Sequence, residues 1–291
     1  MSAWHRFVAF TSAREDGLSL ALFRIATAAV CLWLSVAMLA SDAPALIWID
    51  GGYRAAPVPA EAHLARLLGG STPRVVSLLL SLLGVAGALL LAGVLARAAA
   101  LVALLCAHSL ARLNPEVSGG EDHLLTNALF LLVFADSAKA VSPHKTRGDV
   151  LAWPRRLALL QILLMYFMTG AQKLVSVHWT PGGDFLALHH ILQAPHWQRF
   201  SSLPLAELAP LTRALSLVTV AWELCAPLPW VIKRVDLRAP YVAIGLGFHL
   251  GIAAMMDVDF FSLIAVAYYP CLFRPEELRA FFAKARRAAG S

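Results

Sequence analysis

The chain has 291 residues, of which 59% are hydrophobic and only 14% are charged, and its mean hydropathy is +0.68. This composition excludes an ordinary soluble domain and predicts an integral membrane protein with no room for a second large domain. The net charge of +6 does not indicate a nucleic-acid partner, because the basic residues fall in short segments between apolar runs, where membrane orientation requires them.

The apolar runs predict about eight transmembrane helices, since roughly 20 apolar residues cross a hydrocarbon core of about 30 Å. The first run is too long for a signal-peptide core and is expected to stay as the first helix. The sequence therefore predicts an all-α, polytopic transmembrane bundle that forms one domain over residues 1–291. The expected spans are near residues 18–40, 74–94, 97–113, 123–137, 157–175, 211–231, 239–256 and 259–273.

The distribution of Lys and Arg predicts the orientation of these spans. With the N-terminus inside, the cytoplasmic segments hold more than twice as many basic residues as the outer ones, which favours cytoplasmic N- and C-termini. The long segments 41–73 and 176–210 then lie on the outer side, where their tryptophans favour the membrane interface. Residues 276–291 are expected to form a surface helix. The expected location is the cytoplasmic (inner) membrane of a bacterium.

The four cysteines are scattered along the chain and form no CxxC pair. They are Cys31, Cys106, Cys225 and Cys271. Each lies in or at the end of an apolar run, so we expect apolar packing residues, with neither a disulfide nor a metal site.

Ionisable residues inside apolar runs are costly in a bilayer and are therefore candidate site residues. Arg24 lies in the first span, where its side chain either extends to the inner interface or pairs within the bundle. Glu223 lies near the middle of the sixth span and shares a helical face with Ser216 and Thr219. That polar stripe must face protein, either as structural hydrogen bonds or as the lining of a site.

His249 lies in the seventh span between Gly247 and Gly251, a small-residue pattern that lets helices approach closely. It is either a hydrogen-bonded core group or a site residue. His123 begins the fourth span beside acidic residues, which suit a helix N-terminus. Lys173 lies near the end of the fifth span, where it either reaches the outer headgroups or acts as a shielded base.

These residues are expected to form one group. Counted at about 1.5 Å per residue, Lys173 and His123 lie near the outer face, and Glu223 and His249 lie roughly 10–15 Å deeper. Four polar groups on four helices would then line one pocket that opens toward the outside. The chain has no HExxH, P-loop or GxSxG pattern, so hydrolase and nucleotide-driven readings have no support.

Five segments together resemble the HTTM family, the membrane domain shared with the vitamin K-dependent gamma-glutamyl carboxylases. The resemblance covers nearly the whole chain, and its most specific part surrounds Lys173. The segments, in the family's order, are "ALFRI" at 21–25, "GGEDHLLTNALFLLVF" at 119–134, "QILLMYFMTGAQKLVSVHWTPGGDF" at 161–185, "WELCAPL" at 222–228 and "FHLGIAAMMDVDFFS" at 248–262.

The resemblance implies that Lys173 is the base that deprotonates a reduced vitamin K or menaquinone-type hydroquinone. Oxygenation of the quinol then drives γ-carboxylation of a glutamate side chain by CO2, and His123 and His249 support these steps. The lipophilic quinone would enter from the lipid bilayer, and the substrate would be an acidic peptide or protein on the outer side. The residues expected to bind the cofactor are Tyr166, Gly170, Trp179 and Glu223.

Two departures from the family pattern leave alternatives open. Gln172 stands where the carboxylases have a second lysine, and the large soluble region that grips their substrate has no counterpart after the last span. One alternative is quinone-dependent oxidation or decarboxylation of a peptide. The other is a non-enzymatic quinone- or lipid-binding membrane subunit of the DoxX type, in which Lys173 only anchors its helix.

Overall fold

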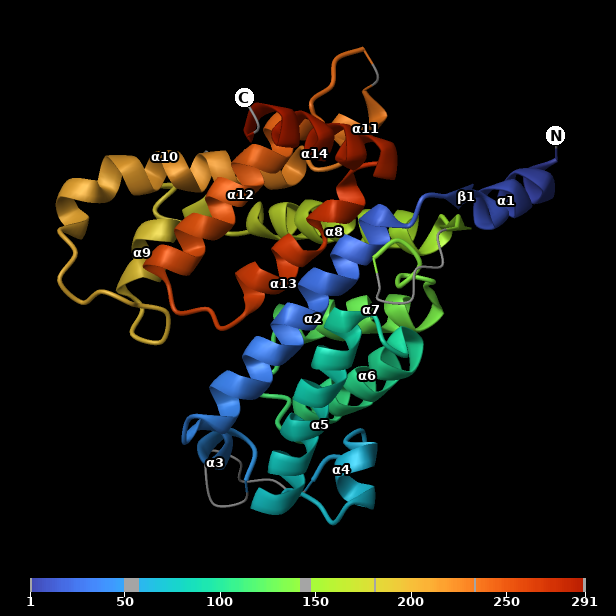
Figure 1. Cartoon of the computed structure of the whole chain (residues 1–291). Coiled ribbons are helices and arrows are strands. Elements are labelled where there is room, and N and C mark those ends of the chain that lie inside the picture. Colours follow the sequence, from blue (N-terminus) through green and yellow to red (C-terminus); the bar gives the residue numbers. More distant parts are fainter. Residues whose placement is uncertain (1, 50–57, 142–147, 181, 233, 290–291) are drawn as a thin grey trace. The chain divides into compact units, whose positions relative to one another are not determined.

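The computed structural model describes residues 2–49, 58–141, 148–180, 182–232 and 234–289 (Figure 1). The described chain is mostly helical, which confirms the all-α prediction. Its strands, β1 (Arg14–Glu15) and β2 (Val150–Leu151), are two residues long and pair antiparallel.

The chain divides into two compact units. Unit 1 comprises Met1–Ala158 with Ala267–Ser291, and unit 2 comprises Leu159–Val266. The boundary falls inside α8 (Trp153–Lys173). The helices of unit 1 are α1 (Ala3–Ser12), α2 (Leu18–Leu39), α3 (Ala43–Ile47), α4 (His63–Leu67), α5 (Pro73–Ala92), α6 (Ala96–Leu113), α7 (Gly120–Phe134), η2 (Tyr269–Leu272) and α14 (Pro275–Ala289).

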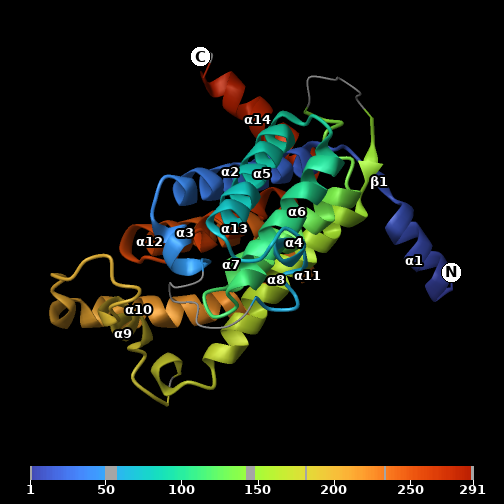
Figure 2. The ribbon, with the colours of Figure 1, turned by 90° about the horizontal axis from the view of Figure 1, so that it is seen from below.

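The core of unit 1 is built from α2, α5, α6 and α7, which pack against one another in chain order (Figures 1 and 2). Local sequence explains the ends of α5. The Thr72 side chain accepts a hydrogen bond from the N–H of Val75, and Pro73 takes the first helical position. Gly93 ends the helix at a φ of +74°, a left-handed conformation that glycine adopts without strain.

Arg24 of α2 is fully buried, so the expectation that it extends to the inner interface is wrong. Its guanidinium donates to the carbonyls of Leu90 and Leu91 at the end of α5, and to that of Val141 at 2.6 Å. A cation beside the last carbonyls of a helix meets both their negative partial charge and their free lone pairs. The alternative of pairing within the bundle therefore holds.

Unit 2 continues from α8 into shorter segments and two longer helices. The short helix α9 lies beside α10, and the N–H of Leu188 donates to the hydroxyl of Ser216 at 3.1 Å (Figure 2). This bond fixes the start of α9 on α10. The helices after α8 are η1 (Val177–Trp179), α9 (Ala187–Gln193), α10 (Leu205–Leu224), α11 (Leu228–Val231), α12 (Arg238–Met255) and α13 (Phe261–Ala267).

Each expected span overlaps one or two helices, but within the described residues four helical stretches, not eight, are long and apolar enough to cross a membrane. These are α2, α5, α6 and the helical stretch Leu205–Val231. The number of such helices is smaller than the eight predicted spans because several of the other helices are short or carry polar residues. The helix α7 has only 15 residues, α13 has seven, and α8 carries two arginines in its first turn. In α12, Arg238, Pro240 and several glycines dilute the apolar side chains.

The other expected elements appear as short helices. The segment 41–73 contains α3 and α4, although residues 50–57 lie outside the described residues. The predicted C-terminal helix is α14. The cysteines are all free, and Cys225 alone among them is exposed.

Candidate functional site

One face of α8 carries three of the predicted site residues. Tyr166, Gly170 and Lys173 are spaced at i, i+4 and i+7, which brings them to the same side of the helix. Each contacts a residue from another helix of unit 2. At about 1.5 Å per residue, Tyr166 and Lys173 lie roughly 10 Å apart along the helix axis.

Lys173 and Glu223 form an ion pair at the C-terminal end of this face. The ammonium nitrogen of Lys173 donates to both carboxylate oxygens at 2.7 Å. The side chain of Glu223 is 4% exposed and that of Lys173 is 22% exposed, so the pair is shielded but reachable at the lysine. The ring of Trp179 lies 5.2 Å from the same nitrogen, within cation–π range.

This contact corrects the expected difference in depth between Lys173 and Glu223. The expectation treated residues 211–231 as one straight span with Glu223 near its middle. Instead α10 ends at Leu224, and α11 begins at Leu228 after a turn. Glu223 therefore lies in the last turn of α10, within reach of the long side chain of Lys173.

At Gly170, α8 lies close against the end of α10. A Cβ atom there would lie 2.9 Å from the Cβ of Glu223 and 3.0 Å from the backbone nitrogen of Leu224. Only glycine fits such a contact without a shift of one helix. Packing thus accounts for Gly170, and its predicted role in cofactor binding stays a prediction.

Tyr166 and His249 form a second polar pair, deeper in unit 2. The tyrosine hydroxyl lies 2.7 Å from Nε2 of His249, and both residues are buried. The Nδ1 atom of His249 lies 3.4 Å from the hydroxyl of Ser262 on α13. The ring of Tyr166 also packs on Trp222, with centroids 4.6 Å apart. His249 is thus a hydrogen-bonded core group.

The polar stripe of α10 faces protein, as predicted. Ser216 and Glu223 are buried and Thr219 is half-buried. The Ser216 hydroxyl both donates to the carbonyl of Thr212 and accepts from α9. The close helix contact predicted at Gly247 and Gly251 of α12 is not found among the described residues. A Cβ atom at Gly247 or Gly251 would meet nothing within 4 Å.

His123 lies in unit 1, on an exposed position in the first turn of α7. The nearby Asp122 carboxylate accepts a hydrogen bond from the N–H of Gly119, which is an ordinary helix-start interaction. A common site of His123 with Lys173 and His249 stays a prediction.

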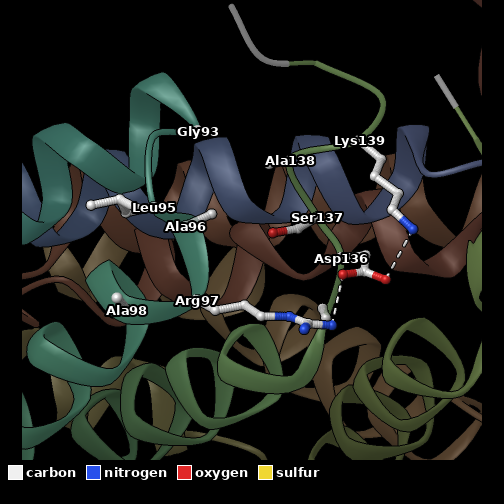
Figure 3. A pocket seen from close by; sticks show the side chains of 10 residues that line it. Gly93, Leu95, Ala96, Arg97, Ala98, Asp136, Ser137, Ala138 and Lys139 are labelled. Carbon is white, nitrogen blue, oxygen red and sulfur yellow. Dashed lines mark ion pairs between the residues drawn. The ribbon is translucent and has the colours of Figure 1, made fainter. Parts of the chain in front are cut away.

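A pocket of about 410 Å³ lies in unit 1 and contains none of the predicted site residues (Figure 3). It lies between the start of α6 and the segment after α7. Its charged lining is an ion-paired group, in which Asp136 binds Arg97 at 2.6 Å and Lys139 at 3.2 Å.

The sequence reasoning missed several residues around these pairs. Trp222 precedes Glu223 directly, and Ser262 lies in the quoted "FHLGIAAMMDVDFFS" segment, so the motifs contained both without marking them. It also missed the convergence of His178, Asp184 and His190. The spacing of two histidines and an aspartate within "VHWTPGGDFLALHH" was the available signal.

Comparison of the chain with protein-family models, with curated proteins and with solved structures gave no match. The geometry by itself defines a helical protein with apolar helices of membrane-spanning length and a shielded lysine–glutamate pair. The resemblance to the HTTM family rests on the five sequence segments.

Proposed function

We propose that the protein is an integral membrane enzyme of the vitamin K-dependent carboxylase type, in which Lys173 is the base that acts on a reduced quinone. The observation that carries this proposal is the contact of the Lys173 nitrogen with both carboxylate oxygens of Glu223 at 2.7 Å. A lysine needs a proton acceptor before it can act as a base, and Glu223 supplies one at hydrogen-bond distance.

The proton moves along this hydrogen bond. Glu223 accepts a proton from the ammonium of Lys173, which leaves a neutral amine beside a neutral carboxylic acid. Two opposite charges lose most of their hydration in a shielded site, so the neutral pair becomes accessible there. The amine lone pair then takes a proton from a hydroquinone hydroxyl at the partly exposed side of Lys173.

The residues near Lys173 suit a quinone with a lipophilic tail. Trp179 offers an aromatic face beside the amine. The exposed apolar side chains of Leu174, Val175 and Val177 follow Lys173 closely along the chain and offer a surface to an isoprenoid tail. A bound reduced quinone supplies the electrons that reduce O2 and, through that reaction, the driving force for removing an unreactive proton from the substrate.

Tyr166 and His249 have a supporting role in this proposal. Their 2.7 Å hydrogen bond lies on the same face of α8 as Lys173. It holds the Tyr166 ring against Trp222, the neighbour of Glu223 in the chain. The pair thereby orients the end of α10 that carries the proton acceptor.

The proposed topology has eight crossings, cytoplasmic N- and C-termini and a site that faces the outer side of a bacterial inner membrane. The excess of Lys and Arg in the segments assigned to the cytoplasm supports it. In this arrangement α7, α8, α12 and the pair α13–η2 cross together with the four long apolar helices.

Reconstitution in vesicles tests the proposed chemistry. The assay contains a reduced naphthoquinone, O2, labelled bicarbonate and a panel of acidic peptides, and it measures quinone epoxide and peptide-bound label. We expect epoxide with the wild type and a loss of about 100-fold or more in Lys173→Ala, the scale of general-base catalysis. Lys284→Ala, which removes an exposed lysine of α14, is the matched control and keeps the wild-type rate.

Other outcomes separate the alternatives. Epoxide formed equally by Lys173→Ala contradicts the assignment of the base. If epoxide forms together with an oxidised or decarboxylated peptide, the quinone chemistry stands, and oxidation or decarboxylation takes the place of carboxylation. Tight quinone binding by the wild type without any epoxide favours the non-enzymatic membrane subunit, for which the stable Lys173–Glu223 pair would be a structural anchor.

A further inference from the structure

The segment between α8 and α10 brings three metal-binding side chains together. His178 comes from η1, Asp184 from the following loop, and His190 from α9. One potential ligand atom from each residue lies within 4.8 Å of the other two. All three belong to unit 2, and none takes part in the proposed base chemistry.

The contacts within this cluster hold the side chains in place. The Nδ1 atom of His178 lies 3.1 Å from both carboxylate oxygens of Asp184. The rings of His178 and His190 meet edge to face, with centroids 4.7 Å apart. The N–H of Leu186 donates to Oδ1 of Asp184 at 2.9 Å.

The backbone of the loop is shaped for this convergence. A Cβ atom at Gly183 would lie 1.8 Å from the carbonyl oxygen of Val177, so only glycine lets the chain fold back onto η1 here. Phe185 has a φ of +54°, a left-handed conformation that costs about 1–2 kcal/mol for a residue with a side chain. Such strain next to Asp184 is typical of a functional loop.

We propose that His178, Asp184 and His190 bind a divalent transition metal of the zinc type, with a fourth position open to water. Two imidazoles and one carboxylate are a donor set that zinc prefers, and tetrahedral zinc ligands lie about 3.3 Å apart. The His178–Asp184 distance already matches this spacing, and small side-chain rotations bring His190 to it. The histidines are exposed, so the ion enters without opening the fold.

The metal would connect η1 to α9 and thereby fix the position of Trp179. That residue follows His178 directly, and its ring lies over Lys173. The helix α9, which supplies His190, is in turn held to α10 by the Leu188–Ser216 hydrogen bond. The metal site goes beyond the proposed function and does not depend on it, because binding can be measured without any quinone.

Titration of the full-length protein in detergent micelles, stripped with chelator and free of any histidine tag, tests this proposal. Calorimetry with Zn²⁺ is expected to give one site per chain, and Co²⁺ should show the visible absorption of tetrahedral coordination. Even residues that only support a ligand contribute roughly 10- to 100-fold to affinity. We therefore expect His178→Ala and His190→Ala each to weaken Zn²⁺ binding by at least that range. His196→Ala removes an exposed histidine of the same segment and should change nothing.

A pair of adjacent glycines provides a second test. Gly183→Ala places a methyl group against the Val177 carbonyl and should weaken Zn²⁺ binding, whereas Gly182→Ala meets nothing within 4 Å and should bind like the wild type. Elution volume and helical circular dichroism verify that each variant is folded. Wild-type protein that takes up no more Zn²⁺ than the His178→Ala/His190→Ala double variant would overturn the proposal.

Discussion

At the scale of single residues, the Lys173–Glu223 pair predicts a large response to a small change. Glu223→Gln keeps the shape of the side chain but leaves the ammonium of Lys173 without its counter-charge. Breaking a buried ion pair on one side costs about 3–5 kcal/mol, and the partial exposure of Lys173 puts the expected loss near the lower end. The measurement is the free energy of unfolding in mixed micelles.

The double variant separates pairing from packing. Lys173→Met/Glu223→Gln removes both charges, so it should recover most of the stability lost by Glu223→Gln alone. Lys284→Ala/Glu223→Gln is the control and should be as unstable as Glu223→Gln. Strictly additive losses in the Lys173→Met/Glu223→Gln double variant would show that the two side chains do not interact.

Sequence alone identified the ionisable residues of this face but not their partners. Lys173, Glu223 and His249 are recognisable because charge and polarity are costly within apolar runs. Pairing depends on where helices cross and where they end, and neither is encoded in hydropathy. The close contact of α8 with α10 at Gly170 brings Glu223 next to Lys173, against the depth expected from residue counting.

At the scale of elements, the contact between α8 and α10 depends on one missing side chain. Gly170→Ala forces a methyl group against the backbone of α10, and overpacking of this kind costs about 1–3 kcal/mol. Gly251→Ala on α12 meets no atom within 4 Å and should instead stabilise its helix by about 0.5–1 kcal/mol. Thermal unfolding of both variants measures the difference, and equal effects would contradict the close approach.

Helix positions were predictable because long apolar runs with proline and glycine between them leave few alternatives. The expected spans at 18–40, 74–94 and 97–113 agree with α2, α5 and α6 to within two residues at each end. Contacts between helices were not predictable in the same way. A glycine pattern marks positions without a side chain, but it does not say which of them faces a neighbour, as Gly170 and Gly247 demonstrate.

At the scale of the whole molecule, the proposed topology predicts both termini on the cytoplasmic side. A reporter that works only in the cytoplasm should be active when fused after residue 291 or before residue 1. A reporter that works only outside the cytoplasm should be active when inserted in the α9–α10 segment. A C-terminal reporter that is active outside would exclude an even number of crossings with a cytoplasmic N-terminus. The sequence predicted the membrane class from composition, but the number of crossings depends on shorter helices such as α7 and α13.

Arg24 has a consequence for the order in which the chain is synthesised. Its partners come later in the chain: the carbonyls of Leu90 and Leu91 lie at the end of α5, and that of Val141 lies after α7. Until then α2 carries an unpaired arginine, which opposes its entry from the translocon into lipid; the cost is at most about 2.5–3.5 kcal/mol, the value for an arginine at the centre of a span. We therefore expect a fragment ending after α2 to insert poorly and Arg24→Leu to improve its insertion, as measured by glycosylation in microsomes. The same substitution in the full chain should reduce stability. The helix α2 is therefore stable in the membrane only after α5 and the segment after α7 have been made.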